Sequence, residues 1–240
     1  AGRSKASGVP PAPTQAPVEL QREADACLAR AAARLGHALR NPLTTIRAGT
    51  QLARRAMPAD APGAAFLDGV EEEALALERL VRGLEALVAL QPMELAPLDL
   101  EELVCRAVDE ARAAAEARGI GLSCLGLHGL RACSAAPLVA AALREVLDNA
   151  VRYGPGGSRV ELKGRRRGGQ VFVEISDGGG GLAPRAGQRL FEPFVSTSGR
   201  PGLGLCRARR AALLAGGSLT LLRSSREGCC FELALPGAEV

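Results

Sequence analysis

Apolar side chains recur in steps of three and four residues over the first part of the chain, the spacing of one helix face. The pattern predicts a helix from about Glu19 to Ala56 and, after a break at 57–63, a second helix over about 64–90. The break contains two prolines, which end a helix because they lack an amide proton and clash with the preceding turn. The first seam consists of Leu28, Ala32, Leu35, Leu39, Pro42, Ile46, Gly49, Ala53 and Ala56, and the second of Val70, Leu77, Leu80, Leu84 and Leu87.

Two long amphipathic helices joined by a short loop form an antiparallel hairpin. The acidic residues Glu71, Glu72, Glu73 and Glu78 of the second helix are expected to face solvent. One hairpin leaves much of each apolar stripe uncovered, so we expect two copies to pair into a four-helix bundle. The sequence therefore predicts a homodimer.

The pattern changes after the proline-containing segment 91–97, which is typical of an interdomain linker. Helices are predicted from Asp99 to Arg118 and from Ser134 to Arg152, with Asp99 and Ser134 as caps, and a last helix over 203–215. Strands are predicted at 120–125, 130–133, 160–163, 171–176, 218–222 and 230–235. The fold class is α+β, a sandwich with strands in one layer and helices in the other. The predicted organisation is a tail (1–18), a helical hairpin (19–92) and an α+β domain (98–237).

Composition excludes several classes of protein. With 47% hydrophobic and 23% charged residues the chain has a globular balance, and no apolar run approaches the roughly 20 residues of a membrane span. We therefore expect no membrane contact within these residues. Seven cysteines form no C-x-x-C pair and only two histidines accompany them, which favours reduced thiols and a cytoplasmic location over a zinc site. Aromatic residues make up 2%, and basic residues are spread out, which argues against nucleic-acid binding.

His37 is the first residue with candidate chemistry. It falls two residues past a seam position, so it is predicted on the outermost face of the first helix. An exposed imidazole can be reached by another domain and is suited to nucleophilic work near neutral pH. Pro42 inside the same helix costs about 3 kcal/mol as a rule, which indicates a kink placed for a purpose. A surface histidine without a role is the alternative for His37 taken alone.

A second candidate set lies on the predicted helix that ends near Arg152. Glu145, Asn149 and Arg152 recur at helical spacing and can share one face. The amide oxygen of Asn149 suits a hard divalent cation, Arg152 suits phosphate oxygens, and Tyr153 suits a flat base. An ordinary polar helix face would show the same pattern.

The third set follows a predicted strand, where four glycines come directly after Asp177. A carboxylate at this place can accept a hydrogen bond from an exocyclic amine. Glycines such as Gly179 and Gly181 let the backbone approach a ligand closely. The chain has no G-K-[ST] sequence and no βαβ unit here, which excludes a Walker loop and a dinucleotide fingerprint.

The fourth set covers Leu190 to Leu205. Phe191 belongs to an aromatic pair in an otherwise polar segment, and such a pair can pin a loop that closes over a ligand. Gly202, Leu203 and Gly204 open a helix whose N-terminal amides favour phosphate.

In this order and spacing, the four sets resemble the core of two-component sensor histidine kinases over roughly residues 20–236. His37 to Pro42 is similar to the H-box of the dimerisation and phosphoacceptor domain, most like the nitrogen-regulation type. The later sets resemble the boxes of the ATP-binding fold shared with gyrase, MutL and heat-shock chaperone ATPases: Glu145 to Tyr153 the N-box, Asp177 to Gly181 the G1 box, Leu190 to Phe194 the F-box and Gly202 to Leu205 the G2 box.

The resemblance implies a division of roles. His37 would take the γ-phosphate of ATP and pass it to an Asp of a response regulator receiver domain, and Asn41 would orient water for dephosphorylating that regulator. Asn149 would hold Mg²⁺, and Asp177 would recognise the adenine amine in a pocket shaped by Gly179 and Gly181. Gly202 and Gly204 would serve the phosphates and a mobile lid.

Three departures from the family pattern keep alternatives open. Ala38 stands where most such kinases have an acidic residue that takes the imidazole proton, help worth about 10²–10⁴ in rate. A nucleotide-binding docking dimer with weak or no autokinase activity is therefore the main alternative. Glu145 replaces a usual Asn, which motivates an ATP hydrolase or Ser/Thr kinase, and Arg200-Pro201 shortens the G2 segment.

Overall fold

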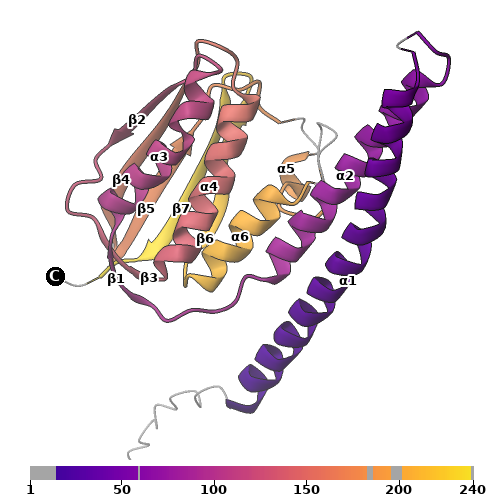
Figure 1. Ribbon diagram of the computed structural model, residues 1–240. Coiled ribbons are helices and arrows are strands. Elements are labelled where there is room, and N and C mark those ends of the chain that lie inside the picture. Colours follow the sequence, from indigo (N-terminus) through magenta and orange to yellow (C-terminus); the bar gives the residue numbers. More distant parts are fainter. Residues whose placement is uncertain (1–14, 59, 183–185, 196–201, 239–240) are drawn as a thin grey trace, which may run out of the picture.

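The structure, a computed structural model, consists of a long helical hairpin and an α/β unit that lies beside one end of it (Figure 1). It describes residues 15–58, 60–182, 186–195 and 202–238, with the backbone alone at 15–30, 33, 186 and 188. The hairpin is formed by α1 (Gln15–Ala56) and α2 (Ala64–Val88), as the apolar spacing predicts. None of the helices in these ranges is both long enough and apolar enough to cross a membrane.

The inner face of the hairpin, where α1 meets α2, combines buried apolar residues such as Leu43 with paired polar ones. Glu78 of α2 is 7% exposed, which corrects the expectation that it faces solvent. Its carboxylate binds Arg47 at 3.1 Å, because a buried charge needs a partner of opposite sign. A series of such contacts, which we call the inner ladder, joins the helices: Arg40–Glu85 at 2.7 Å, Arg47–Glu78 at 3.1 Å, Gln51–Glu71 at 2.6 Å and Arg54–Asp68 at 3.1 Å.

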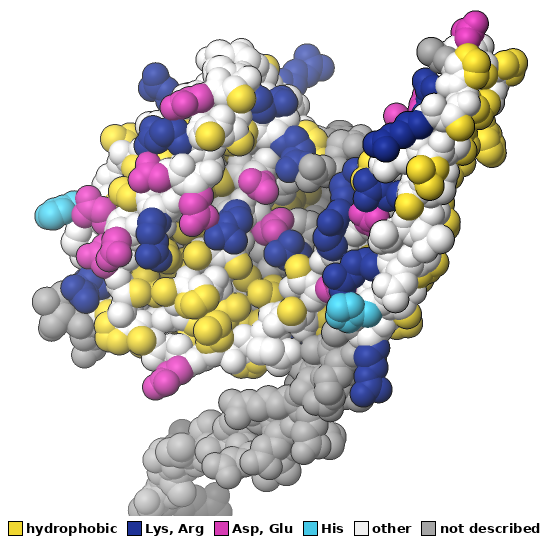
Figure 2. All heavy atoms as spheres, in the orientation of Figure 1, with side chains coloured by type: hydrophobic (Ala, Val, Ile, Leu, Met, Phe, Trp, Pro, Cys, Tyr) yellow, Lys and Arg dark blue, Asp and Glu magenta, His cyan; other side chains and the backbone are white. Residues whose placement is uncertain are grey.

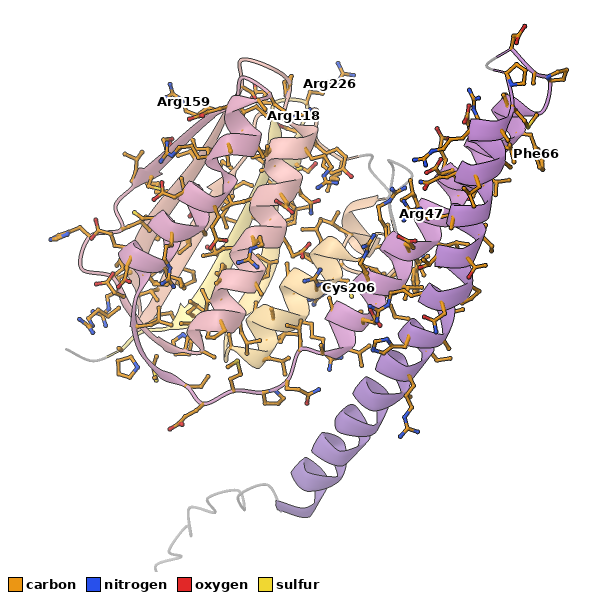
Figure 3. All side chains as sticks on the ribbon, viewed as in Figure 1. Arg47, Phe66, Arg118, Arg159, Cys206 and Arg226 are labelled. Atoms are coloured by element: carbon orange, nitrogen blue, oxygen red, sulfur yellow. The ribbon has the colours of Figure 1, made fainter. Side chains whose placement is uncertain are left out.

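The apolar seam lies on the face of the hairpin that α2 does not cover. Leu35, Leu39 and Ile46 of α1 are 60%, 48% and 46% exposed, and Phe66 near the loop is 74% exposed. Figure 2 shows yellow apolar side chains along the outer edge of the hairpin and basic side chains facing the α/β unit. Phe66 projects away from the α/β unit, whereas Arg47 lies on the inner side (Figure 3). The stripe is thus available to a second hairpin.

The α/β unit is a five-stranded sheet covered on one face by three helices (Figure 1). The strand order is β2-β4-β5-β7-β6, with β2 and β4 parallel and the other pairs antiparallel. The strands are β2 (Gly121–Leu125), β4 (Arg159–Arg167), β5 (Gln170–Ser176), β6 (Ser218–Ser225) and β7 (Gly228–Pro236), and the helices are α3 (Leu100–Glu116), α4 (Ala136–Tyr153) and α6 (Gly204–Leu214), with a short α5 (Ala186–Arg189). Apolar residues such as Leu143, Leu147, Leu162 and Leu233 fill the space between the layers.

Three local predictions have mixed outcomes. Asp99 is the N-cap of α3, since its side chain accepts from the amides of Glu101 and Glu102. Ser134 does not cap α4: Ala135 takes that position, and the Ser134 hydroxyl donates to the carbonyl of Ala215 instead. Part of the predicted linker is a strand, β1 (Ala96–Asp99), which pairs with β3 (Arg131–Ser134). Its proline, Pro97, and its short length hide it from a pattern analysis.

Candidate functional site

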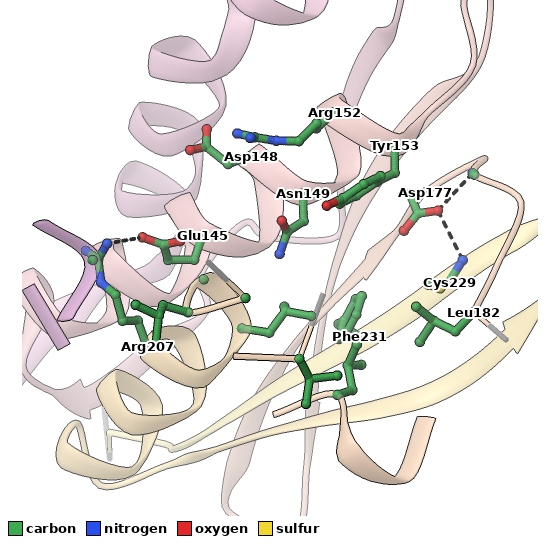
Figure 4. A pocket seen from close by; sticks show the side chains of 18 of the residues that line it. Glu145, Asp148, Asn149, Arg152, Tyr153, Asp177, Leu182, Arg207, Cys229 and Phe231 are labelled. Atoms are coloured by element: carbon green, nitrogen blue, oxygen red, sulfur yellow. Dashed lines mark hydrogen bonds and ion pairs between the residues drawn. The ribbon is translucent and has the colours of Figure 1, made fainter. Parts of the chain in front are cut away.

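A cavity of about 740 Å³ opens at the carboxyl end of β5, between α4, the start of α6 and α2. The polar residues of α4 point into it, and so do residues of the glycine-rich loop after β5 (Figure 4). Eleven of the thirteen predicted site residues are on the α/β unit, and the structure brings ten of these to the cavity wall. They are Glu145, Asn149, Arg152, Tyr153, Asp177, Gly179, Gly181, Gly202, Leu203 and Gly204.

Helix α4 presents the polar stripe that its spacing predicts. Val146, Leu147 and Ala150 are almost completely buried against the sheet, so the intervening Glu145 and Asn149 turn toward the cavity. Arg152 continues the stripe, and its Nε is buried without a hydrogen-bond partner in the described part of the chain. A buried donor of this kind is suited to an anionic ligand.

Asp177 follows the last residue of β5 and anchors the loop. Its Oδ1 accepts hydrogen bonds from the amides of Gly179 at 2.8 Å and Cys229 at 3.1 Å (Figure 4). Both bonds use one oxygen of the carboxylate, so the carboxyl plane is fixed by the backbone. The site therefore presents a preoriented carboxylate at the cavity wall.

The glycines of this loop are needed for contact with the β6–β7 turn. Gly181 has φ +70°, and a Cβ there would lie 2.0 Å from the carbonyl oxygen of Ser225. A Cβ on Gly179 would lie 2.9 Å from Oδ1 of Asp177. Neither position accepts a larger residue without moving the loop, since contacts under 3 Å are not tolerated.

Helix α6 begins directly over the polar stripe of α4. A Cβ on Gly204 would lie 2.9 Å from Oε2 of Glu145, so glycine permits this approach. Arg207, one turn into α6, pairs with Glu145 at 2.9 Å (Figure 4). The start of α6 thus lies close to both Glu145 and Asn149, and the N-terminus of a helix favours an anion.

Phe191 is the predicted residue of the α/β unit that does not line the cavity. It lies behind the wall, edge-on to Phe231 with the ring centroids 6.4 Å apart, and the guanidinium of Arg209 lies 5.1 Å from its ring. Phe231 lines the cavity in its place. The pair Arg200-Pro201 lies outside the described residues.

His37 and Asn41 lie one turn apart on α1, and both are exposed. Neither lines the cavity, whose α-hairpin wall comes from α2 alone. In this structure the exposed imidazole of His37 therefore lies outside the cavity.

Comparison with known proteins agrees with this arrangement. Residues 28–92 match the family model "His Kinase A (phospho-acceptor) domain", and residues 135–239 match "Histidine kinase-, DNA gyrase B-, and HSP90-like ATPase". The chain is a two-component histidine kinase core. This identification confirms the predicted family and fold class.

Relatives of the kinase core are sensor proteins. The chain is 30% identical over 213 residues to alginate biosynthesis sensor protein KinB of Pseudomonas aeruginosa. The aligned region covers 85% of this chain and 36% of KinB. It is 31% identical over 182 residues to the sensor-like histidine kinase SenX3 of Mycobacterium tuberculosis, covering 71% of this chain and 44% of SenX3. The chain thus spans between a third and a half of the length of these relatives.

Solved structures show the same architecture. Full-length ShkA in complex with AMPPNP superposes with a TM-score of 0.64 at 26% identity, over 88% of this chain and 46% of that one. The histidine kinase AdeS of Acinetobacter baumannii superposes with a TM-score of 0.59 at 19% identity, over 85% of this chain and 98% of that one, and supports the fold alone.

The wall contributed by α2 is a feature of the kinase core that sequence reasoning missed. Arg79, Arg82 and Gly83 line the cavity together with the α/β residues. A Cβ on Gly83 would lie 2.8 Å from Cδ1 of Leu203, so this glycine lets α2 approach the start of α6. The available signal was Gly83 itself, because a glycine inside a helix costs about 1 kcal/mol relative to alanine unless a close contact requires it.

Burial raises the pKa of Glu145, and this outweighs the opposite effect of Arg207. A carboxyl group whose pKa is raised in the folded state binds its proton at a higher pH in the folded protein than in the unfolded chain. The free energy of unfolding therefore falls as pH rises from the ordinary pKa of 4.5 through the raised pKa, because only the folded protein still holds the proton in this range. Glu145→Gln removes this loss, so the melting temperature of the variant relative to the parent should increase with pH across that window. A constant difference in thermal melts between pH 4 and 8 would contradict it.

Proposed function

We propose that this kinase core binds ATP with Mg²⁺, phosphorylates His37 and passes the phosphoryl group to an Asp of a response regulator receiver domain. One observation carries the proposal: the oriented Asp177 carboxylate, the polar stripe of α4 and the start of α6 surround a single cavity, in a chain that also displays an exposed His37. Phosphoryl transfer needs mainly positioning and charge neutralisation, which this set of groups provides.

The roles within the cavity follow from the chemistry of its walls. The oxygen of Asp177 that is not engaged by Gly179 and Cys229 would accept from the exocyclic amine of adenine. Tyr153 and Phe231 offer ring surfaces to the base. Arg152 and the backbone amides that lead into α6, at Gly202, Leu203 and Gly204, would face the phosphates. Phe191 would not contact the base itself but would hold the ring of Phe231 in place through their edge-on contact.

The residues present fit a magnesium ion held together with phosphate. The amide of Asn149 and the carboxylate of Glu145 both lie near Gly204 at the start of α6, and they offer oxygen ligands. Mg²⁺ is commonly held by one or two protein oxygens plus substrate phosphates. When bound, it would neutralise charge on the phosphates. The described residues hold no cluster of three or more His, Cys, Asp or Glu side chains for a metal.

The exposed His37 would be the phosphoacceptor that another domain reaches. It is exposed on α1 and outside the cavity, so the α/β unit must move relative to α1 for the ring to meet a bound nucleotide. Asn41, exposed one turn later, would orient water when the regulator is dephosphorylated. The similarity of this segment to the nitrogen-regulation type stays a prediction.

We infer a homodimer from the exposed seam of the hairpin. Leu39→Glu together with Ile46→Glu would place charge in the centre of this stripe, where both parent residues are nearly half exposed in one chain. We expect the double variant to be monomeric by sedimentation at concentrations where the parent is dimeric. Leu213→Glu, an exposed leucine on α6, is the matched control and should remain dimeric. A dimeric double variant would refute the assignment of the seam.

The proposal is tested with the whole chain, radiolabelled ATP and Mg²⁺. We expect a phosphoryl label on the protein that is labile in acid and stable in base, as a phosphoramidate is, and that transfers to a receiver domain. Absence of label with intact nucleotide binding would favour the second candidate, a docking dimer without efficient kinase chemistry, for which Ala38 is the motivating residue. A hydrolase is disfavoured because Arg207 engages Glu145, the residue that would activate water.

A cytoplasmic location forms part of the proposal, since ATP is the substrate. The six described cysteines are free, as a reducing compartment requires.

A further inference from the structure

Ala38 leaves the phosphoacceptor helix without an acidic side chain directly after His37. Once the imidazole has been phosphorylated, its remaining N–H must give up a proton, and a nearby carboxylate speeds such a transfer. The described residues on α1 that flank His37 include no carboxylate between residues 31 and 50. A carboxylate that could accept the proton of this ring must therefore come from another element.

Glu85 of α2 lies against the backbone of α1 at the residue just before His37. A Cβ on Gly36 would lie 1.7 Å from Oε1 of Glu85, 2.3 Å from Cδ and 2.8 Å from Cγ. The carboxyl group thus occupies the space that any other side chain at position 36 would fill. Gly36 is buried, although glycine is unfavourable inside a helix by about 1 kcal/mol, and this contact explains its presence.

Arg40 holds the Glu85 carboxylate in this position next to Gly36. Its Nη2 donates to Oε1 of Glu85 at 2.7 Å, and its Nε donates to the carbonyl of Gly36 at 3.3 Å. One oxygen of Glu85 is therefore held by a guanidinium that is itself tied to α1. Successive side chains diverge by about 100° around a helix, so the His37 side chain leaves α1 next to the face on which Gly36 meets Glu85. His37 and Glu85, both among the described residues, form no ion pair, so the ring has to turn toward α2 to reach the carboxylate.

We propose that Glu85 supplies, from α2, the carboxylate that Ala38 does not provide, and that it accepts the imidazole proton during phosphorylation of His37. One ring nitrogen attacks the γ-phosphorus of ATP, the bond to the β-phosphate oxygen breaks, and ADP leaves with that electron pair. The proton on the other ring nitrogen passes to Oε2 of Glu85, which gives a phosphohistidine with an uncharged ring and a carboxylic acid that releases its proton to water. The inference rests on the proposed kinase function and adds a residue to it.

The test compares initial labelling rates in the whole chain. Glu85→Gln keeps the size of the side chain and should lower the rate on the order of 10²-fold, the smaller end of a general-base contribution. Glu78→Gln is the matched control, because Glu78 is also an acidic α2 residue paired with an arginine of α1, and its rate should stay within a few fold of the parent. Both variants should bind an ATP analogue as the parent does.

Two further variants separate chemistry from structure. Gly36→Ala places a methyl group where the carboxylate lies, so it should displace Glu85 and slow labelling. Ala38→Glu should restore most of the rate in the Glu85→Gln background and change the parent rate only a few fold. A structural role for Glu85 predicts no such rescue.

Three outcomes would overturn the inference: an unchanged rate in Glu85→Gln, an equal loss in Glu78→Gln, or the same gain from Ala38→Glu in both backgrounds. Absence of label in the parent chain would instead defeat the proposed function itself, so the two failures are distinguishable.

Discussion

Replacing His37 with Gln is expected to abolish the acid-labile phosphoryl label completely. Glutamine keeps a polar side chain of similar length at an exposed helix position, so the fold and nucleotide binding should not change. It has no nucleophilic ring nitrogen, and the chemical step has no substitute for one. The label is measured by gel autoradiography after acid and base treatment.

The matched control is the second histidine of the described chain, His128. Its side chain is 97% exposed and lies next to Glu101 on the α/β unit, away from the cavity-lining residues. His128→Gln should be labelled at the parent rate. If His37→Gln kept its label, or if the label resisted acid, the acceptor would be a different residue and the phosphohistidine mechanism would be refuted.

Asp177→Asn is expected to weaken binding of ATP by about 100-fold. The Oδ1 atom of Asn can still accept from Gly179 and Cys229, so the loop should keep its position. The other carboxylate oxygen becomes an amide donor facing an adenine amine, which is also a donor. A charged hydrogen bond is worth about 1.5–3 kcal/mol, and 1.4 kcal/mol is a factor of ten in affinity.

Asp148→Asn provides the comparison for this variant. Asp148 also lines the cavity and carries the same charge, but it is exposed on α4. Calorimetric titration with an ATP analogue should give it an affinity within a few fold of the parent, and thermal melting should show both variants folded. Equal losses in the two variants would mean that overall charge, and not adenine recognition, sets the affinity.

The sequence predicts the elements of this protein better than their contacts. Regular apolar spacing sets the lengths of α1 and α2, and Asp99 is a cap that sequence chemistry can recognise. The seam residues Leu35, Leu39 and Ile46 lie on a face that α2 does not cover, which fits the inferred contact with another copy. The polar contacts of the inner face were missed because charged residues such as Glu78 are ordinarily assigned to solvent.

Candidate residues of the cavity are accessible to sequence reasoning where they share one helix face or one loop. Phe191 shows the limit, because an aromatic residue near a ligand loop can contact the ligand or support a neighbour, and only the fold shows that Phe231 stands between. Arg79 and Arg82 were beyond prediction, since they reach the cavity from a helix that is separate in sequence.

The inner ladder has a consequence for how the hairpin can transmit motion. Arg40, Arg47 and Arg54 are spaced seven residues apart, and Glu85, Glu78 and Glu71 of the antiparallel helix repeat at the same interval. Sliding one helix along the other by a single turn would separate the buried Glu78 from Arg47 and leave it only Arg82 of its own helix, whereas restoring the pairs between the helices takes a whole heptad, about 10 Å. A signal arriving through α1 is therefore better carried as a rotation or tilt of both helices together than as a piston stroke between them.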